Sequence, residues 1–294
     1  MRRRGRAVGR RGEESAGPAQ RATPATTLGG QLRLSAARGL DALLFSSVGA
    51  AGVASALVLA AGPALGVRPG STALGLAFAG TLVVYNVDRL RDLQDDRRTA
   101  PERSAFVRSH GGGLALLAAL AGLTAGSFAL ALGPVAWWLC GAVLELGLLH
   151  RRLKRLPGLK TLYVTGAWLA VVVGLPALTA APVEDVRAGV LWVSAVYAGA
   201  IGPNLMVSNL RDSENLAARA GPRSVLRLAR AIAACGVGIA LFGPGAVRPL
   251  ACVPLAELAA LACYRPTERY GLAAVDGALA LGAVAAWALS GPAR

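Results

Sequence analysis

Long stretches without a charged residue constrain this sequence more than any other feature. Five of them are uncharged throughout, and they cover residues 42–67, 69–87, 111–144, 161–183 and 188–210. A helix that crosses the hydrocarbon core of a membrane needs about 20 apolar residues. The sequence therefore predicts an all-α, polytopic membrane protein.

We predict about nine transmembrane helices. The stretch 111–144 is long enough for two of them, divided at Gly133-Pro134, and three weaker apolar segments follow towards the C-terminus. The predicted spans are 42–62, 70–88, 112–132, 134–150, 162–181, 188–208, 226–243, 247–263 and 271–290. Two regions result, a tail over 1–37 and a transmembrane domain over 38–294.

The positive charges predict the orientation of these spans. Of the 31 Lys and Arg residues, 27 lie in the N-terminal tail or near the loops after the second, fourth, sixth and eighth spans, and four lie elsewhere. Cytoplasmic loops of membrane proteins carry the excess of Lys and Arg. We therefore expect a multi-pass cell membrane protein with a cytoplasmic N-terminus and an external C-terminus. Topology also explains the net charge of +15 without a nucleic-acid partner.

The tail, residues 1–37, is rich in Arg, Gly, Ala and Pro and has no apolar segment typical of a signal peptide. This composition predicts a disordered segment that lies on anionic membrane lipids. An organellar transit peptide is the alternative.

A first acidic cluster follows the second span, in the stretch "YNVDRLRDLQDDRR" at residues 85–98. Asp88, Asp92 and Asp96 recur every four residues, so a helix would place them on one face, where like charges repel unless a cation neutralises them. Mg²⁺ suits such a group, since it binds one or two carboxylates together with phosphate oxygens. The alternative is a solvated helix end balanced by neighbouring arginines. The position of Asp88 near the membrane favours a functional role.

A second polar cluster follows the sixth span and contains Asn209, Asp212 and Glu214, with arginines around them. Two acid-bearing helix ends on one side of the membrane suit a diphosphate held by metal ions. An ordinary polar loop is the alternative. Between the clusters, the basic segment after the fourth span includes Lys154 and Arg155. These two could hold a lipid diphosphate, or act as an orientation signal and headgroup anchor.

Three further acids, Glu145, Glu257 and Asp276, fall inside predicted spans. Acids at membrane depth are functional candidates and face the interior of a bundle. For Glu257 and Asp276 we predict hydrogen bonds between helices. A transporter that uses the three acids as a proton or cation path is an alternative, although the sequence lacks the two matching halves of such proteins.

The order of these motifs resembles the UbiA superfamily of intramembrane prenyltransferases. In "DRLRD", Asp88 and Asp92 have the spacing of the last two aspartates of the family's first motif, N-D-x-x-D-x-x-x-D. In "HRRLKR", His150 and Lys154 stand where the family's Y-x-x-x-K motif has tyrosine and lysine.

The stretch 209–224 resembles the family's second aspartate motif. The positions that fit are Arg211, Asp212, Gly221, Arg223 and Ser224. Two departures stand out in this motif, because its outer aspartates fall at Asn209 and Leu216. In the first motif the leading Asn-Asp falls at Val84-Tyr85, although Asn86 lies nearby.

The resemblance implies a UbiA-like helical bundle and an enzyme that transfers a prenyl group, with Mg²⁺, from a polyprenyl diphosphate to a lipid-soluble acceptor, aromatic or a quinone precursor. It implies catalytic roles for Asp88, Asp92 and Asp212. The implied metal ligands are Asp88, Asp92, Asp96, Asn209, Asp212 and Glu214, and the implied diphosphate ligands are Lys154, Arg155, Arg211, Arg223 and Asn86. The alternative is a non-catalytic UbiA-like protein that binds isoprenoid lipid or a partner, which the weakened second motif favours.

Overall fold

The computed structural model describes residues 39–94, 96–153, 159–179, 183–208, 210 and 220–291, without the side chains of residues 96, 150–152 and 183–185. The predicted tail lies outside these ranges. Within them the chain is helical, as predicted, and has no strand. After the short helix Gly39–Phe45 come α2 (Val48–Ala64), α3 (Ser71–Arg91), α4 (Asp96–Thr99), α5 (Pro101–Leu132), α6 (Pro134–Leu153), α7 (Leu159–Val172), α8 (Gly174–Leu178), α9 (Val183–Ser208), α11 (Pro222–Phe242), η2 (Gly245–Ala251), α12 (Cys252–Ala262), α13 (Glu268–Tyr270), η3 (Gly271–Val275) and α14 (Asp276–Leu289).

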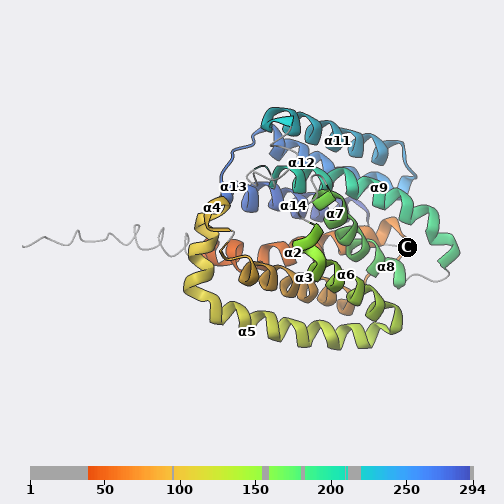
Figure 1. Cartoon of the computed structure of the whole chain (residues 1–294). Helices are drawn as coiled ribbons and strands as arrows, with labels where there is room; N and C mark the ends of the chain where they lie inside the picture. The colour runs from red at the N-terminus through yellow and green to blue at the C-terminus, as the bar shows by residue number, and fades with distance from the viewer. Residues whose placement is uncertain are drawn as a thin grey trace, which may run out of the picture. The chain divides into compact units, whose positions relative to one another are not determined.

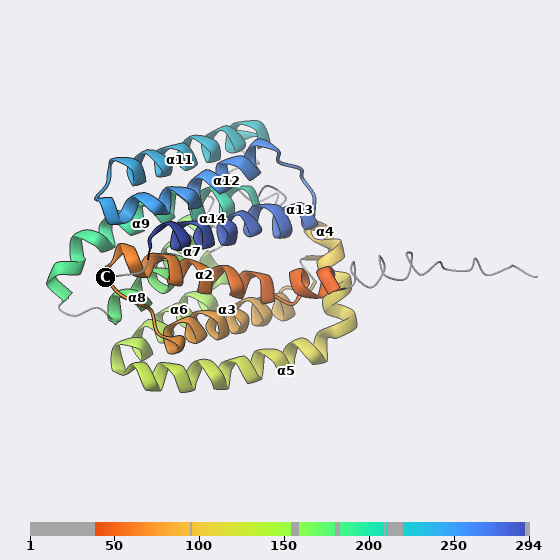
Figure 2. The same ribbon diagram turned by 180° about the vertical axis from the view of Figure 1, so that it is seen from behind.

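The long helices form a closed ring. In the order α5, α3, α2, α14, α12, α11, α9, α7 and α6, each helix packs against the next, and α6 packs against α5 again. Figure 1 shows α6, α7 and α9 in front, and Figure 2 shows the other wall of the ring from behind. The middle of the bundle is therefore enclosed by helices on all sides.

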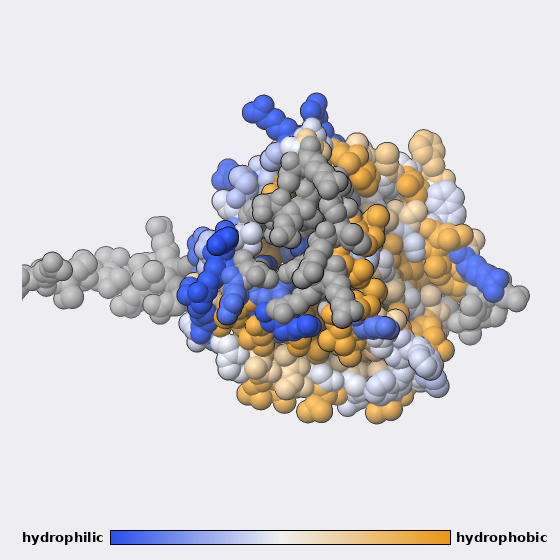
Figure 3. Space-filling view, viewed as in Figure 1, coloured by the Kyte–Doolittle hydropathy of each residue, from blue (hydrophilic) through white to orange (hydrophobic). Residues whose placement is uncertain are grey.

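Each of the nine predicted spans is helical over most of its length, but the count of nine is not confirmed. Among the described residues, seven helices are long and apolar enough to cross a membrane, and the bent pair Gly39–Phe45 and Val48–Ala64 raises this number to eight. The apolar part of α6, Pro134–Leu149, is shorter than the others. Large apolar side chains cover the outer faces, and Figure 3 shows hydrophilic side chains gathered at the end where α4 lies. This surface suits a protein embedded in lipid.

The first predicted span is broken rather than straight. Its two helices meet at an angle of 65°, and Ser47 at the break has a positive φ of 68°. The buried Arg89 of α3 donates hydrogen bonds to the carbonyls of Leu44 and Phe45, which end the first helix. The Ser47 hydroxyl donates to the Oδ1 atom of Asn86 at 3.1 Å. Polar groups of α3 thus satisfy the backbone where the helix is interrupted.

Glycines allow several helices to approach closely. A Cβ atom on Gly199 of α9 would lie 2.6 Å from the Cα atom of Gly236 on α11. Likewise, a Cβ atom on Gly282 of α14 would lie 2.6 Å from the carbonyl oxygen of Cys252 at the start of α12. Small residues at helix contacts are typical of membrane bundles, where close packing replaces the hydrophobic effect.

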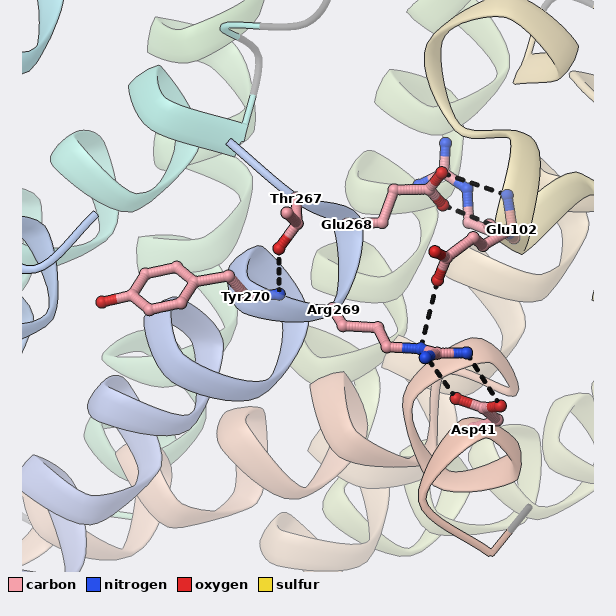
Figure 4. A network of polar contacts seen from close by, with 7 residues as sticks. Asp41, Glu102, Thr267, Glu268, Arg269 and Tyr270 are labelled. Atoms are coloured by element: carbon pink, nitrogen blue, oxygen red, sulfur yellow. Dashed lines mark hydrogen bonds and ion pairs between the residues drawn. The ribbon is translucent and has the colours of Figure 1, made fainter. Parts of the chain in front are cut away.

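A charged network fastens three segments at the end of the bundle where α4 lies (Figure 4). The Arg269 Nε atom lies 3.1 Å from a carboxylate oxygen of Asp41 and 3.1 Å from one of Glu102. The buried Glu268 carboxylate accepts hydrogen bonds from the backbone N–H groups of Glu102 and Arg103, which begin α5. The network joins the first helix, α5 and α13.

Candidate functional site

A small cavity lies inside the ring of helices. Residues of α2, α3, α7, α9 and α14 line it, and its volume is about 20 Å³. A cavity of this size holds one water molecule or one hydroxyl group. One wall is apolar, with Val53 and Leu279, and the other carries Tyr85, Asn204 and Asp276. The cavity therefore has a polar side in an otherwise apolar bundle.

Tyr85 and Trp168 form the part of the polar wall nearest to the first acidic cluster. The Trp168 indole N–H donates to the Tyr85 hydroxyl oxygen at 3.1 Å, and the two rings meet edge to face with centroids 6.2 Å apart. The Tyr85 hydroxyl also interacts electrostatically with Asp88 and Asp276. Since it accepts one hydrogen bond and donates none within the described part of the chain, its proton is available to a ligand.

The rest of the polar wall comes from the later helices. The Asn204 side-chain amide donates to a carboxylate oxygen of Asp276 at 3.1 Å, which joins α9 to α14. This bond confirms the predicted hydrogen bond between helices for Asp276. Glu257 of α12 is fully buried beside both residues. Glu257 interacts with the Asn204 side chain, in agreement with the predicted contact between helices, although neither of its carboxylate oxygens meets a donor with full hydrogen-bond geometry within the described part of the chain.

The first acidic cluster lies at the end of α3, three residues beyond Tyr85. Asp88 is exposed, whereas Asp92, one turn later, is 8% exposed. Asn86, a predicted diphosphate ligand, is fully buried against Ser47 and does not line the cavity. The structure thus brings Asp88 and Asp92 to one helix end and directs Asn86 to the break in the first span.

Most other predicted site residues lie outside the described part of the chain. These are Lys154, Arg155, Asn209, Arg211, Asp212 and Glu214, together with the side chain of Asp96. Arg223 is described, and it is exposed in the first turn of α11. Among the described residues, no three Asp, Glu, His or Cys side chains come close enough to hold a metal ion.

The two motif-bearing helices converge on the cavity. Tyr85 of α3 and Asn204 of α9 both line it, and each lies about one turn before the start of its polar cluster. The chain therefore brings its second and sixth predicted spans to one cavity.

Sequence reasoning missed Asn204 and Trp168 as parts of this site. Each is a single polar or amphipathic residue in a long apolar stretch, and such residues are common in membrane helices. A signal for Asn204 was present, since a side-chain amide inside a span needs a partner on another helix. The sequence offered no way to decide that the partner was Asp276.

No family model and no curated protein matches this sequence. Solved structures do match. The apo structure of a UbiA homolog from Aeropyrum pernix K1 superimposes with a TM-score of 0.59 at 19% identity, over 79% of this chain and 96% of that one. A digeranylgeranylglyceryl phosphate synthase covers 84% of this chain and 98% of its own at 13% identity, with a TM-score of 0.49. The first of these likenesses confirms the predicted fold: this chain is a helical membrane bundle with the UbiA fold.

Proposed function

We propose that this protein is a divergent member of the UbiA superfamily that transfers a prenyl group from a polyprenyl diphosphate to a lipid-soluble acceptor. The observation that carries the proposal is the convergence of α3 and α9 on one cavity of a UbiA-type bundle. Each helix leads directly into one of the two polar clusters that the diphosphate chemistry requires. The proposed setting is a cell membrane, with the motif loops and the N-terminus on the cytoplasmic side and the C-terminus outside.

The diphosphate would bind at the helix ends. Asp88 and Asp92 lie one turn apart at the end of α3. Arg223 stands in the first turn of α11, at the positive end of the helix dipole, which favours an anion. Lys154, Arg155 and Arg211 remain proposed diphosphate ligands, whereas the prediction of Asn86 as a ligand is corrected, because its side chain is fully buried against Ser47 at the break in the first span. Cationic groups at this end would absorb the negative charge that develops as the diphosphate leaves.

The residues at the end of α3 fit Mg²⁺. Asp88 offers an exposed carboxylate, and Mg²⁺ in proteins commonly binds one or two carboxylates plus phosphate oxygens and water. When bound, the ion would stabilise the negative charge of the diphosphate. We propose Asp88, Asp92 and Asp96 as ligands on this side, and Asp212 with Asn209 or Glu214 on the other.

The prenyl chain would lie among apolar side chains. The cavity, at about 20 Å³, is too small for that chain, so Val53 and Leu279 would adjoin only its reacting end, and the helices around it exclude bulk water. Exclusion of water matters because an allylic cation formed by loss of diphosphate would otherwise be hydrolysed. The acceptor, rather than water, is then the nucleophile next to that carbon.

A second candidate function is a non-catalytic protein that binds isoprenoid lipid or a partner. It is favoured by Asn209 and Leu216, which stand where the second motif has acids. Such a protein would keep the apolar interior but would no longer bind diphosphate through metal ions.

The test is the unfolding temperature of the detergent-purified protein with a series of prenyl diphosphates, in Mg²⁺ and in EDTA. A ligand raises this temperature if it binds the folded state. We expect a Mg²⁺-dependent rise that Asp88→Asn and Asp212→Asn abolish. The matched control is Glu145→Gln, because Glu145 is exposed on α6 and away from the cavity, contrary to its predicted position in the bundle interior.

Other outcomes separate the two candidates. A rise with prenyl alcohols as well as diphosphates, equal in Mg²⁺ and EDTA, would identify an isoprenoid-binding protein without the enzyme's chemistry. Absence of any rise, in protein that unfolds cooperatively, would refute the prenyltransferase proposal.

A further inference from the structure

Three polar residues from three helices meet inside the apolar bundle, and the proposed diphosphate site does not use them. Asn204, Glu257 and Asp276 come from α9, α12 and α14. Asn204 lies four residues before the end of α9, which places it roughly 6 Å inside that helix end. Asp276 begins α14 eight residues after Glu268, roughly 12 Å from the charged end of the bundle.

Glu257 makes this arrangement costly without a ligand or a proton. Its side chain is fully buried, and apart from an interaction with Asn204 that falls short of full hydrogen-bond geometry, neither carboxylate oxygen meets a donor among the described residues. It also interacts electrostatically with a second carboxylate, Asp276. Adjacent carboxylates in an apolar interior repel each other and are expensive to desolvate. A hydrogen-bond donor that enters the cavity would meet Asp276, which lines it, and would relieve part of that cost.

The backbone directs Asp276 towards the cavity. The π-helical segment η3, Gly271–Val275, directly precedes Asp276. A π-helical turn contains an extra residue, and such turns are frequent at functional sites. Because each residue of a helix turns by about 100°, the extra residue changes the face on which Asp276 lies. With η3 in place, Asp276 lines the cavity and accepts from Asn204.

The cavity sets the size of the group that Asp276 can receive. Its volume of about 20 Å³ fits one hydroxyl group or one water molecule. Tyr85 lies on the same wall and interacts electrostatically with both Asp88 and Asp276. Asp276 therefore shares the cavity with Tyr85, which lies three residues before Asp88 of the first acidic cluster.

We propose that Asp276, held by Asn204 and backed by Glu257, binds a hydroxyl group of the acceptor and makes the site selective for neutral, hydroxylated acceptors over carboxylates. The proposal rests on the proposed function. A hydroxyl donates a hydrogen bond to the Asp276 carboxylate, whereas an acceptor carboxylate would face two acids in a medium of low dielectric constant. Tyr85 can donate its free hydroxyl proton to the oxygen of the same hydroxyl.

The test uses three small aromatic probes on the full chain in detergent, without diphosphate. Hydroquinone is neutral and donates two hydrogen bonds, 1,4-dimethoxybenzene has the same ring without donors, and 4-hydroxybenzoate carries a carboxylate. We expect hydroquinone to raise the unfolding temperature in a saturable way. The dimethoxy compound is expected to have no effect, and 4-hydroxybenzoate at least a tenfold higher apparent Kd.

The variants assign the effect to the cluster. Asp276→Asn keeps a carbonyl that accepts from Asn204, so the fold is retained, and it is expected to raise the apparent Kd for hydroquinone at least tenfold. Glu257→Gln keeps a polar side chain beside Asn204 and is expected to leave the binding of 4-hydroxybenzoate weak, because Asp276 still carries its charge. Glu145→Gln on α6, outside the cavity lining, is the matched control and is expected to behave like the native protein.

Failure of this inference is distinguishable from failure of the proposed function. Equal effects of hydroquinone and 1,4-dimethoxybenzene on the native protein would overturn the inference, and that comparison needs no variant. Equal hydroquinone binding by native protein and Asp276→Asn would overturn it too. Neither result bears on the Mg²⁺-dependent rise with prenyl diphosphate, which tests the proposed function alone and which Asp276→Asn is expected to retain.

Discussion

Neighbouring residues of the first acidic motif have different tasks in the structure. Asp88 is exposed at the helix end, whereas Arg89, the next residue, is 4% exposed and bonds the carbonyls of Leu44 and Phe45. Arg89 thus satisfies backbone groups that the break in the first span leaves without helical partners. One short stretch of sequence serves the proposed chemistry and also holds the first helix in its bent form.

We predict that Arg89→Ala destabilises the protein. The substitution leaves two buried carbonyls without their donor and removes hydrogen bonds from a charged group, each worth about 1.5–3 kcal/mol. The expected result is a clear fall in the unfolding temperature in detergent. Arg97→Ala, at an exposed position of α4, is the control and is expected to leave that temperature unchanged. Equal stability of the two variants would contradict the structural role of Arg89.

The role of Arg89 was not predictable from the sequence, and the reason is physical. All arginines of "DRLRDLQDDRR" suit the balancing of nearby acids, so the sequence does not distinguish them. Arg89 bonds the backbone at the break between the first helix and α2. That break contains no proline or glycine, and it depends on Ser47, whose φ is 68°. A residue other than glycine rarely adopts that conformation, and it does so where tertiary contacts impose it.

At the scale of helices, the proposed site depends on how closely α9 and α11 pack. These helices flank the second polar cluster, and they meet at Gly199 and Gly236. The contact leaves no room for a side chain on either residue. The separation of the two helices, and with it the position of Asn204 on α9, is therefore set by a pair of glycines.

We predict that Gly199→Ala lowers the unfolding temperature. The new Cβ atom would lie 2.6 Å from a backbone atom of α11, which only a shift of the helices can relieve. Forcing extra atoms into a packed contact costs about 1–3 kcal/mol. Gly202→Ala on the same helix is the matched control, because a Cβ atom there meets nothing within 4 Å. If both substitutions instead raised the unfolding temperature, helix propensity rather than packing would explain the result.

Hydropathy predicted where helices exist better than where they begin. A membrane leaves a chain few ways to satisfy its backbone other than a helix, so long uncharged stretches become helices. The ends obey other rules: α5 begins at Pro101, well before the predicted start at 112. Its charged first turns lie in the network with Glu268, and a proline in the first turn suits a helix start. Hydropathy alone does not detect such an extension.

At the scale of the bundle, the charged network indicates which helix ends share a face. Asp41 near the start of the first helix pairs with Arg269 at the start of the last span. The last span, Glu268–Leu289, then runs for 22 residues, roughly 33 Å, to the opposite end. The described chain therefore begins and ends on opposite faces. This arrangement agrees with an odd number of crossings.

We predict that a membrane-impermeant maleimide labels Gly70→Cys but not Arg98→Cys on intact cells. The two positions flank α3, and both are exposed. The labelling is done after replacement of the four native cysteines, which are free thiols. Since the positive-inside rule places the more basic loops in the cytoplasm, Arg98 is expected inside, with the acidic cluster. Permeabilised cells are the control, in which both cysteines should react. Labelling of Arg98→Cys but not of Gly70→Cys would show that the proposed diphosphate site faces the outside of the cell. A cytoplasmic prenyl diphosphate could not reach a site on that side.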